Sequence, residues 1–169
     1  PYYEIQEAPE AFTAGSAVSR MIDGLGFRFY WASEGLRIED LNFRPSKKGR
    51  TTLETIQHIF GLTNVIHNSV TKKQHENGNP TEMTYEELRK SILFRLKESS
   101  DILRESEDIS EFKIVFQKGD QKTEYPFWNQ INGPISDAIW HTGQIVSFRR
   151  TSGNPYNSKA SVFSGKVRN

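Results

Sequence analysis

Apolar residues recur at steps of three and four along four separate stretches of the chain, and this period constrains the fold more than any other feature. The first stretch, residues 13–36, carries Val18, Met21, Ile22, Leu25 and Phe29. In the second, which begins at Thr51 or Thr52, the apolar positions from Leu53 to Ile66 cover an arc of roughly 220° on a helical wheel. An arc that wide suits a helix packed against several neighbours. The pattern therefore predicts a mostly helical protein.

Two further stretches complete the helical pattern. The third helix is predicted to begin after Thr84, with Glu87 three residues further on in the spacing of a capping box, and to end by Ser106. The fourth is predicted to begin at Pro134, because a turn signal precedes this residue and proline fits the first helical position. It should stop before Gly153, which is followed by further turn-forming residues.

Between the third and fourth helices the period changes from helical to alternating. Large apolar residues take every second position over residues 112–116, and Thr123, Tyr125 and Phe127 alternate in the same way over residues 123–127. Lys118-Gly119-Asp120 lies between the two stretches as a turn. This pattern predicts a small β-hairpin. The expected fold class is therefore all-α, a four-helix bundle with a β-hairpin inserted between its third and fourth helices.

A chain of 169 residues has the length of one ordinary domain. We expect an N-terminal arm over residues 1–12, a bundle domain over residues 13–155 and a C-terminal tail over residues 156–169. The arm is rich in Pro and Glu and has no clear period, and the tail is polar, with Tyr156 and Phe163 as candidate anchors.

The charge balance and the cysteine count exclude several classes of function. Lys and Arg total 22 against 21 Asp and Glu, so no basic field points to a nucleic-acid partner. No apolar run approaches the ~18 residues that span a bilayer. The absence of Cys excludes disulfides, thiolate nucleophiles and Cys-based zinc sites. The chain begins at Pro1 without Met, so we expect either a cytoplasmic protein or one exported after loss of an upstream segment.

The residues best suited to chemistry lie on the fourth predicted helix. Asp137 and His141 are four residues apart and therefore share one helical face, together with Gln144. A carboxylate and an imidazole that project together at the margin of a bundle core can share a metal ion or a proton. A third ligand would have to come from another helix, where His58 and His67 are candidates. These two are nine residues apart, on opposite sides of their helix, and helical-wheel geometry does not choose between them.

Spacing alone leaves a structural interpretation open as well. An Asp and a His one turn apart often form a plain hydrogen-bonded pair, and the spacing is less specific than that of an established metal motif. His75 lies in the polar loop of residues 72–83 and is expected to face solvent. Arg149 and Arg150 at the end of the fourth helix could attract an anionic substrate, but they also favour the helix dipole, which we take as their role.

Two segments of the chain resemble the DinB-like (YfiT-like) superfamily of metal-binding proteins. They are RTTLETIQHI over residues 50–59 and DAIWHTGQI over residues 137–145, and the order and spacing of the helices agree over roughly residues 13–154. The resemblance implies a four-helix bundle and a divalent metal ion held by three side chains. One is a His of the second helix, and two are histidines spaced HxxxH on the fourth.

Carried over by position, His58 and His141 match these ligands, and the resemblance therefore selects His58. Asp137 stands where the first His of the HxxxH pair would be, and a carboxylate can also ligate a divalent ion. The donor set would accept zinc, nickel, iron or manganese and leaves positions open for water or substrate. The implied activity is that of a hydrolase-like or thiol-transferring enzyme acting on a small molecule. Gln144 is expected to support a ligand, and Gly143 to let a neighbouring helix approach.

Two other functions remain open at this point. With Asp137 paired to His141 in place of a metal, the chain would be a metal-free helical bundle with a degenerate site, serving as a binding or interaction module. It could also be a homodimer whose cleft binds a small apolar ligand, for which Tyr30, Trp31 and Trp140 are suggestive.

Overall fold

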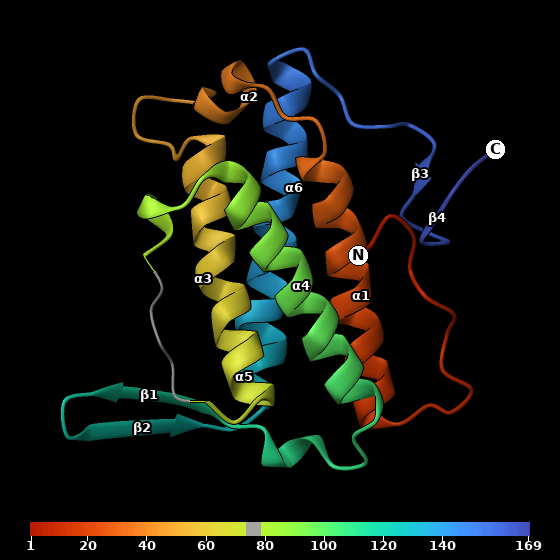
Figure 1. The fold of residues 1–169 in the computed structure, drawn as a ribbon, viewed down its shortest axis with the longest axis vertical. Coiled ribbons are helices and arrows are strands. Elements are labelled where there is room, and N and C mark those ends of the chain that lie inside the picture. Colours follow the sequence, from red (N-terminus) through yellow and green to blue (C-terminus); the bar gives the residue numbers. More distant parts are fainter. Residues whose placement is uncertain (74–78) are drawn as a thin grey trace.

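The computed structural model describes residues 1–73 and 79–169, and this part of the chain is mostly helical, as the apolar period predicts. Its long helices are α1 (Ala14–Ser33), α3 (Thr52–Val70), α4 (Tyr85–Arg104) and α6 (Ser136–Thr151). α1 and α6 point one way and α3 and α4 the other (Figure 1). Contacts join α1 to α4, α4 to α3, α3 to α6 and α6 to α1, so the core lies between all of them.

The core is apolar at most of the positions that the helical period marks, although Met21 of α1 is 40% exposed. Its fully buried side chains include Ile22, Leu25, Phe29, Ile56, Ile59, Leu88, Ile92, Leu96, Ile135 and Ile145. Each contributes about 1.5–3 kcal/mol through the removal of apolar surface from water. No helix of the described part is both long and apolar enough to cross a membrane.

Threonine residues are the N-caps of three of the long helices. Thr51 Oγ1 accepts a hydrogen bond from the backbone N–H of Glu54 at 3.0 Å, and the Glu54 carboxylate accepts the Thr51 N–H at 2.7 Å. Thr84 and Glu87 form the same reciprocal pair at the start of α4, and Thr13 caps α1. Such caps satisfy backbone donors that have no partner within the helix. The predicted helix starts at Thr51 and Thr84 are thus confirmed.

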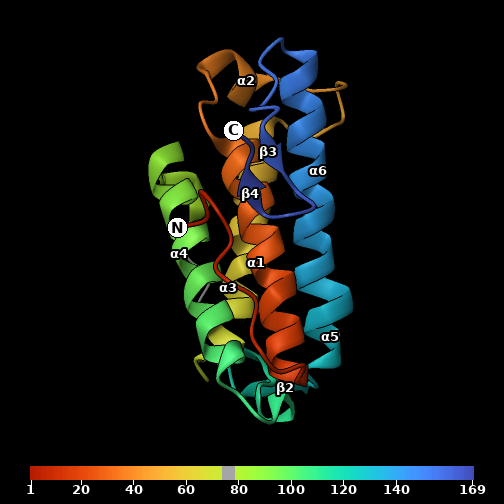
Figure 2. The same ribbon diagram turned by 90° about the vertical axis from the view of Figure 1, so that its right-hand side faces the viewer.

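The N-terminal arm lies along α1 (Figure 2). Tyr2 is 5% exposed, and its ring lies against Gly26, where a Cβ atom would meet ring carbons. The Tyr2 hydroxyl donates to the buried carboxylate of Asp23 at 3.1 Å, and Asp23 also pairs with Arg104 at 3.0 Å. Burial and the Asp23 carboxylate raise the pKa of Tyr2, which keeps the hydroxyl protonated. The arm is therefore held in place by specific contacts.

The β-hairpin forms where the alternating pattern predicts it. β1 (Ile114–Lys118) pairs antiparallel with β2 (Gln121–Tyr125), and Gly119 takes φ +60° in the tight turn between them. Several short elements of the described part were not predicted, and two of them lie near the ends of the long helices or in the tail. One is the short helix α2 (Ile38–Asn42), and the other is a second small hairpin of β3 (Ala160–Ser161) and β4 (Lys166–Val167). Short 3₁₀ helices span Pro80–Glu82 and Ile109–Glu111.

Of the two anchors predicted for the C-terminal tail, the structure supports one. Tyr156 packs against a small cluster that contains Phe27 and Trp31 of α1 and Ile5 of the arm. Phe163 is 100% exposed, so its prediction as an anchor is wrong. It falls in the turn between β3 and β4, where its side chain has no cover from the rest of the described chain.

The structure agrees with the prediction that the fourth helix begins at Pro134. The backbone leaves helical geometry at Gly133, with φ −97° and ψ −108°, and this kink separates the helical backbone before it from α6. The short helix α5 (Trp128–Gln130), which was not predicted, leads into the turn Ile131–Ile135 that contains the kink. Proline lacks an N–H and its fixed φ suits the first helical position, so Pro134 can begin the helix after the kink. The buried Gln130 donates to the Val65 carbonyl at 3.2 Å and holds the turn against α3.

Arg149 contributes to a different helix end than the one predicted. It is buried, and its Nη1 donates to the carbonyl oxygens of Trp31, Ala32 and Glu34 at 2.9–3.0 Å. These are carbonyls at the C-terminal end of α1, which lack partners within that helix. The Arg149 guanidinium therefore satisfies the free carbonyl groups at the end of α1. Arg150 is exposed, and its guanidinium lies over the ring of Tyr156.

Candidate metal centre

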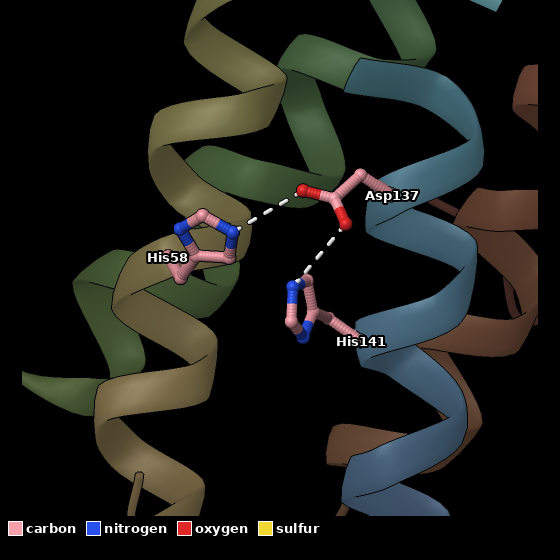
Figure 3. Close-up of side chains that lie close together, drawn as sticks. All are labelled: His58, Asp137 and His141. Atoms are coloured by element: carbon pink, nitrogen blue, oxygen red, sulfur yellow. Dashed lines mark hydrogen bonds and ion pairs between the residues drawn. The ribbon is translucent and has the colours of Figure 1, made fainter. Parts of the chain in front are cut away.

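Three side chains from two helices converge at the margin of the core (Figure 3). His58 extends from α3 toward Asp137 and His141 on α6, and one ligand atom from each lies within 4.8 Å of the other two. Asp137 is between the two histidines. Its Oδ2 is 3.3 Å from Nε2 of His58, and its Oδ1 is 3.3 Å from Nε2 of His141. The two imidazole rings are nearly perpendicular, with centroids 4.5 Å apart.

The packing of α3 against α6 sets the position of these groups. Ile56 and Ile59 on α3 and Ala138 and Ile145 on α6 are fully buried, which orients both helices with respect to the core. The three polar side chains extend from the flanks of these buried faces. They remain 32%, 40% and 14% exposed for His58, Asp137 and His141. The cluster is therefore open to solvent on one side while the core supports it on the other.

Gln144 determines which nitrogen of His141 carries the proton. The Gln144 Oε1 atom is 2.7 Å from Nδ1 of His141, and an amide oxygen can only accept a hydrogen bond. The proton is therefore on Nδ1, and in the neutral ring Nε2 presents a lone pair. That lone pair faces the carboxylate oxygen of Asp137 at 3.3 Å. Two acceptors face each other here, and a cation between them, either a metal ion or a proton, makes the arrangement favourable.

The distances are compatible with a metal ion and are longer than ideal hydrogen bonds, and they end on different oxygens of Asp137. A hydrogen bond between a charged imidazole and a carboxylate is typically about 2.7–2.9 Å long. Both Asp137–His separations are 3.3 Å. Ligand atoms at about 2.1 Å from a tetrahedral ion lie ~3.4 Å from one another, close to the observed value. The donor set of two imidazoles and one carboxylate is also the set of a site that keeps positions open for water or substrate.

The surroundings of His58 favour its neutral form. Burial and the positive charge of Arg50 lower the pKa of His58, and these effects outweigh the opposing influence of Asp137. A metal ion binds the unprotonated ring, so a lowered pKa makes His58 available as a ligand at lower pH. Both ligand histidines thus have a local reason to present a lone pair to the cluster.

Among the described residues, His67 is the other histidine, and it does not join this cluster. His67 extends toward α4, where its Nε2 lies 2.8 Å from the carboxylate of Glu98. His75 lies outside the described residues, so its expected exposure to solvent is not addressed. The predicted role of Gly143 is wrong: it is exposed, and no atom lies within 4 Å of the position of a Cβ. Gly143 points away from the helices that pack against α6.

The segment before α6 borders the cluster. Asn132, Gly133 and Pro134 lie about one helical turn before Asp137 and line the surface pocket beside it. The sequence predicted a helix boundary at these residues, and the kink at Gly133 agrees with it. The short helix α5, which leads into this segment, was not predicted from the sequence.

Comparison of the chain with protein-family models, with curated proteins and with solved structures gives no match.

Proposed function

We propose that this chain is a DinB-like four-helix bundle that binds one divalent metal ion through His58, Asp137 and His141. We propose further that it is a metal-dependent enzyme, hydrolase-like or thiol-transferring, acting on a small molecule. The convergence of three ligand atoms within 4.8 Å is the observation that carries the proposal. The closed ring of contacts among α1, α4, α3 and α6 supports the bundle, and the resemblance of two sequence segments supports the family.

The composition of the site limits which ions it would hold. Imidazole and carboxylate together suit zinc, nickel, iron or manganese, and the absence of a thiolate removes preference for soft ions. A bound ion would supply Lewis acidity, polarising a substrate carbonyl or lowering the pKa of a nucleophile. Asp137 contributes one negative charge, and Gln144 keeps the His141 ring oriented through the hydrogen bond to Nδ1. The exposure of the ligands leaves the cluster accessible to a substrate.

Metal analysis of the purified chain and of single variants tests this proposal. After reconstitution with zinc, nickel or manganese and removal of excess ion, mass spectrometry should find about one ion per chain. His58→Ala and His141→Ala should each abolish this stoichiometric binding. His67→Ala is the matched control, since His67 lies on the same helix as His58 but pairs with Glu98. Equal metal content in all four proteins, or none in any, would overturn the proposed metal centre.

A metal-free binding module is the second candidate function. One observation favours it: the two oxygens of Asp137 face the two histidines at equal distances of 3.3 Å, as a carboxylate that holds two protonated rings would do. In that case Asp137→Asn would destabilise the fold, and no ion would bind at any concentration that leaves the protein intact. In the metal-enzyme case the same variant weakens metal binding and has little effect on the stability of the metal-free protein.

A further inference from the structure

A surface pocket of about 460 Å³ adjoins the candidate metal centre and shares Asp137 with it. Its wall on α3 is formed by Leu62, and its wall on α6 by Trp140. The segment at the start of α6 contributes Gly133 and Pro134 to the lining. A volume of this size accommodates a single ring with short substituents.

The helical period explains why the pocket lies beside the cluster. Leu62 is four residues after His58 and therefore occupies the same face of α3, one turn further along. Trp140 is three residues after Asp137 on α6, which places it next to the carboxylate. Gly133 adds space at the bottom, since no atom lies within 4 Å of the position of a Cβ there. The pocket is thus one turn away from a metal-ligand candidate on each helix.

The lining of the pocket exposes mostly apolar surface, and its polar members are Asn132, Ser136 and Asp137. Among the described residues that line it, Asp137 is the one with a charged side chain. Trp140 is 73% exposed although it is the largest apolar side chain there. An indole that faces an open pocket offers a flat surface on which a planar group can stack. Contact with such a group would remove apolar surface of Trp140 and Leu62 from water.

We propose that this pocket binds the planar apolar portion of the substrate, an aryl or similarly unsaturated group, while an oxygen-bearing group of the same molecule reaches the cluster of His58, Asp137 and His141. This inference rests on the metal centre proposed above and adds the class of substrate to it. It excludes small aliphatic and strongly charged molecules as preferred substrates. Asp137 belongs to both sites and marks where the two portions of the substrate meet.

Two metal-chelating probes that differ only in their apolar group test the inference. Acetohydroxamic acid carries a methyl group and benzohydroxamic acid a phenyl ring, and both chelate zinc in the same way. Isothermal titration calorimetry with the zinc-loaded protein should give a Kd about tenfold lower for the phenyl compound, the increment expected from ring burial and stacking. Trp140→Ala should reduce this preference to about twofold or less, and Trp140→Phe should retain most of it.

Trp128→Ala is the matched control, because Trp128 is 75% exposed and does not line this pocket. Neither tryptophan is buried, so both variants should fold. A phenyl preference that is equal in wild type and Trp140→Ala overturns the aryl pocket and leaves the metal centre intact. A preference lost equally in both tryptophan variants also overturns it. If neither hydroxamate binds because no zinc is retained, the metal centre is refuted and the inference with it.

Discussion

Replacing Gln144 by Leu should weaken metal binding without removing a ligand. The substitution keeps the approximate volume of the side chain and deletes the oxygen that accepts the His141 Nδ1 proton at 2.7 Å. A hydrogen bond between neutral groups contributes about 1 kcal/mol, whereas one to a charged group contributes about 1.5–3 kcal/mol. When a cation binds at Nε2, positive charge spreads over the His141 ring. The hydrogen bond from Nδ1 to Gln144 then becomes more like one to a charged group.

The expected weakening follows from that difference. The hydrogen bond is lost in the metal-free state as well, so the difference of roughly 0.5–2 kcal/mol is what changes the affinity, and it corresponds to a metal Kd about two to thirty times higher. His141 is only 14% exposed, so water replaces the lost oxygen poorly. Competition with a chromophoric zinc chelator measures the Kd, and the ¹⁵N shifts of the imidazole report which nitrogen is protonated.

Two further variants separate this effect from a general loss of packing. Gln144→Glu retains an oxygen acceptor and should keep the Nδ1-protonated ring and most of the affinity. Gln57→Leu removes an amide of α3 whose nitrogen faces the Pro80 carbonyl, and it should leave the Kd unchanged. The reasoning is refuted if Gln144→Leu is folded and binds zinc as tightly as wild type, or if Gln57→Leu weakens binding equally.

Two predictions concern the stability of the fold. Asp40→Asn should lower the free energy of unfolding by about 2 kcal/mol at pH 7, because the buried carboxylate accepts charge-assisted hydrogen bonds from Arg37. These bonds hold the pKa of Asp40 below its usual range. Its stabilisation is therefore present above the unfolded pKa of about 4 and is lost as the pH falls below it, so urea unfolding at pH 3 should show a smaller difference. Gly26→Ala should lower stability by about 2 kcal/mol, since a Cβ displaces Tyr2 and this loss exceeds the gain of about 1 kcal/mol in helix propensity. Gly61→Ala, at an exposed helical position with no atom within 4 Å, should instead raise it, and equal effects of the two substitutions would contradict the packing argument.

The features that could be predicted from the sequence are those that depend on neighbouring residues. Thr51 with Glu54 and Thr84 with Glu87 form capping pairs within one turn, and Gly119 permits the turn of the hairpin. The helical period also placed Asp137 and His141 on a common face. Each of these predictions requires only the local geometry of the chain.

Features that depend on contacts between distant residues could not be predicted from the local sequence. The short helix α5 before the boundary at Gly133 was not predicted, and its Gln130 donates to a carbonyl of α3 that lies 65 residues away along the chain. Arg149 acts on the end of α1, which is 115 residues or more away along the chain.

The candidate metal site combines both kinds of information. Helical spacing supplied Asp137 with His141, and it placed His58 and His67 on opposite sides of their helix without choosing between them. The family resemblance selected His58 over His67 in the sequence, and the packing of α3 against α6 brings His58 to the other two residues in the structure. His58 faces α6 while His67 faces Glu98 on α4. The chain by itself determines which residues share a helical face, but only tertiary packing decides which faces meet, because that depends on burying the apolar surfaces of all the helices at once.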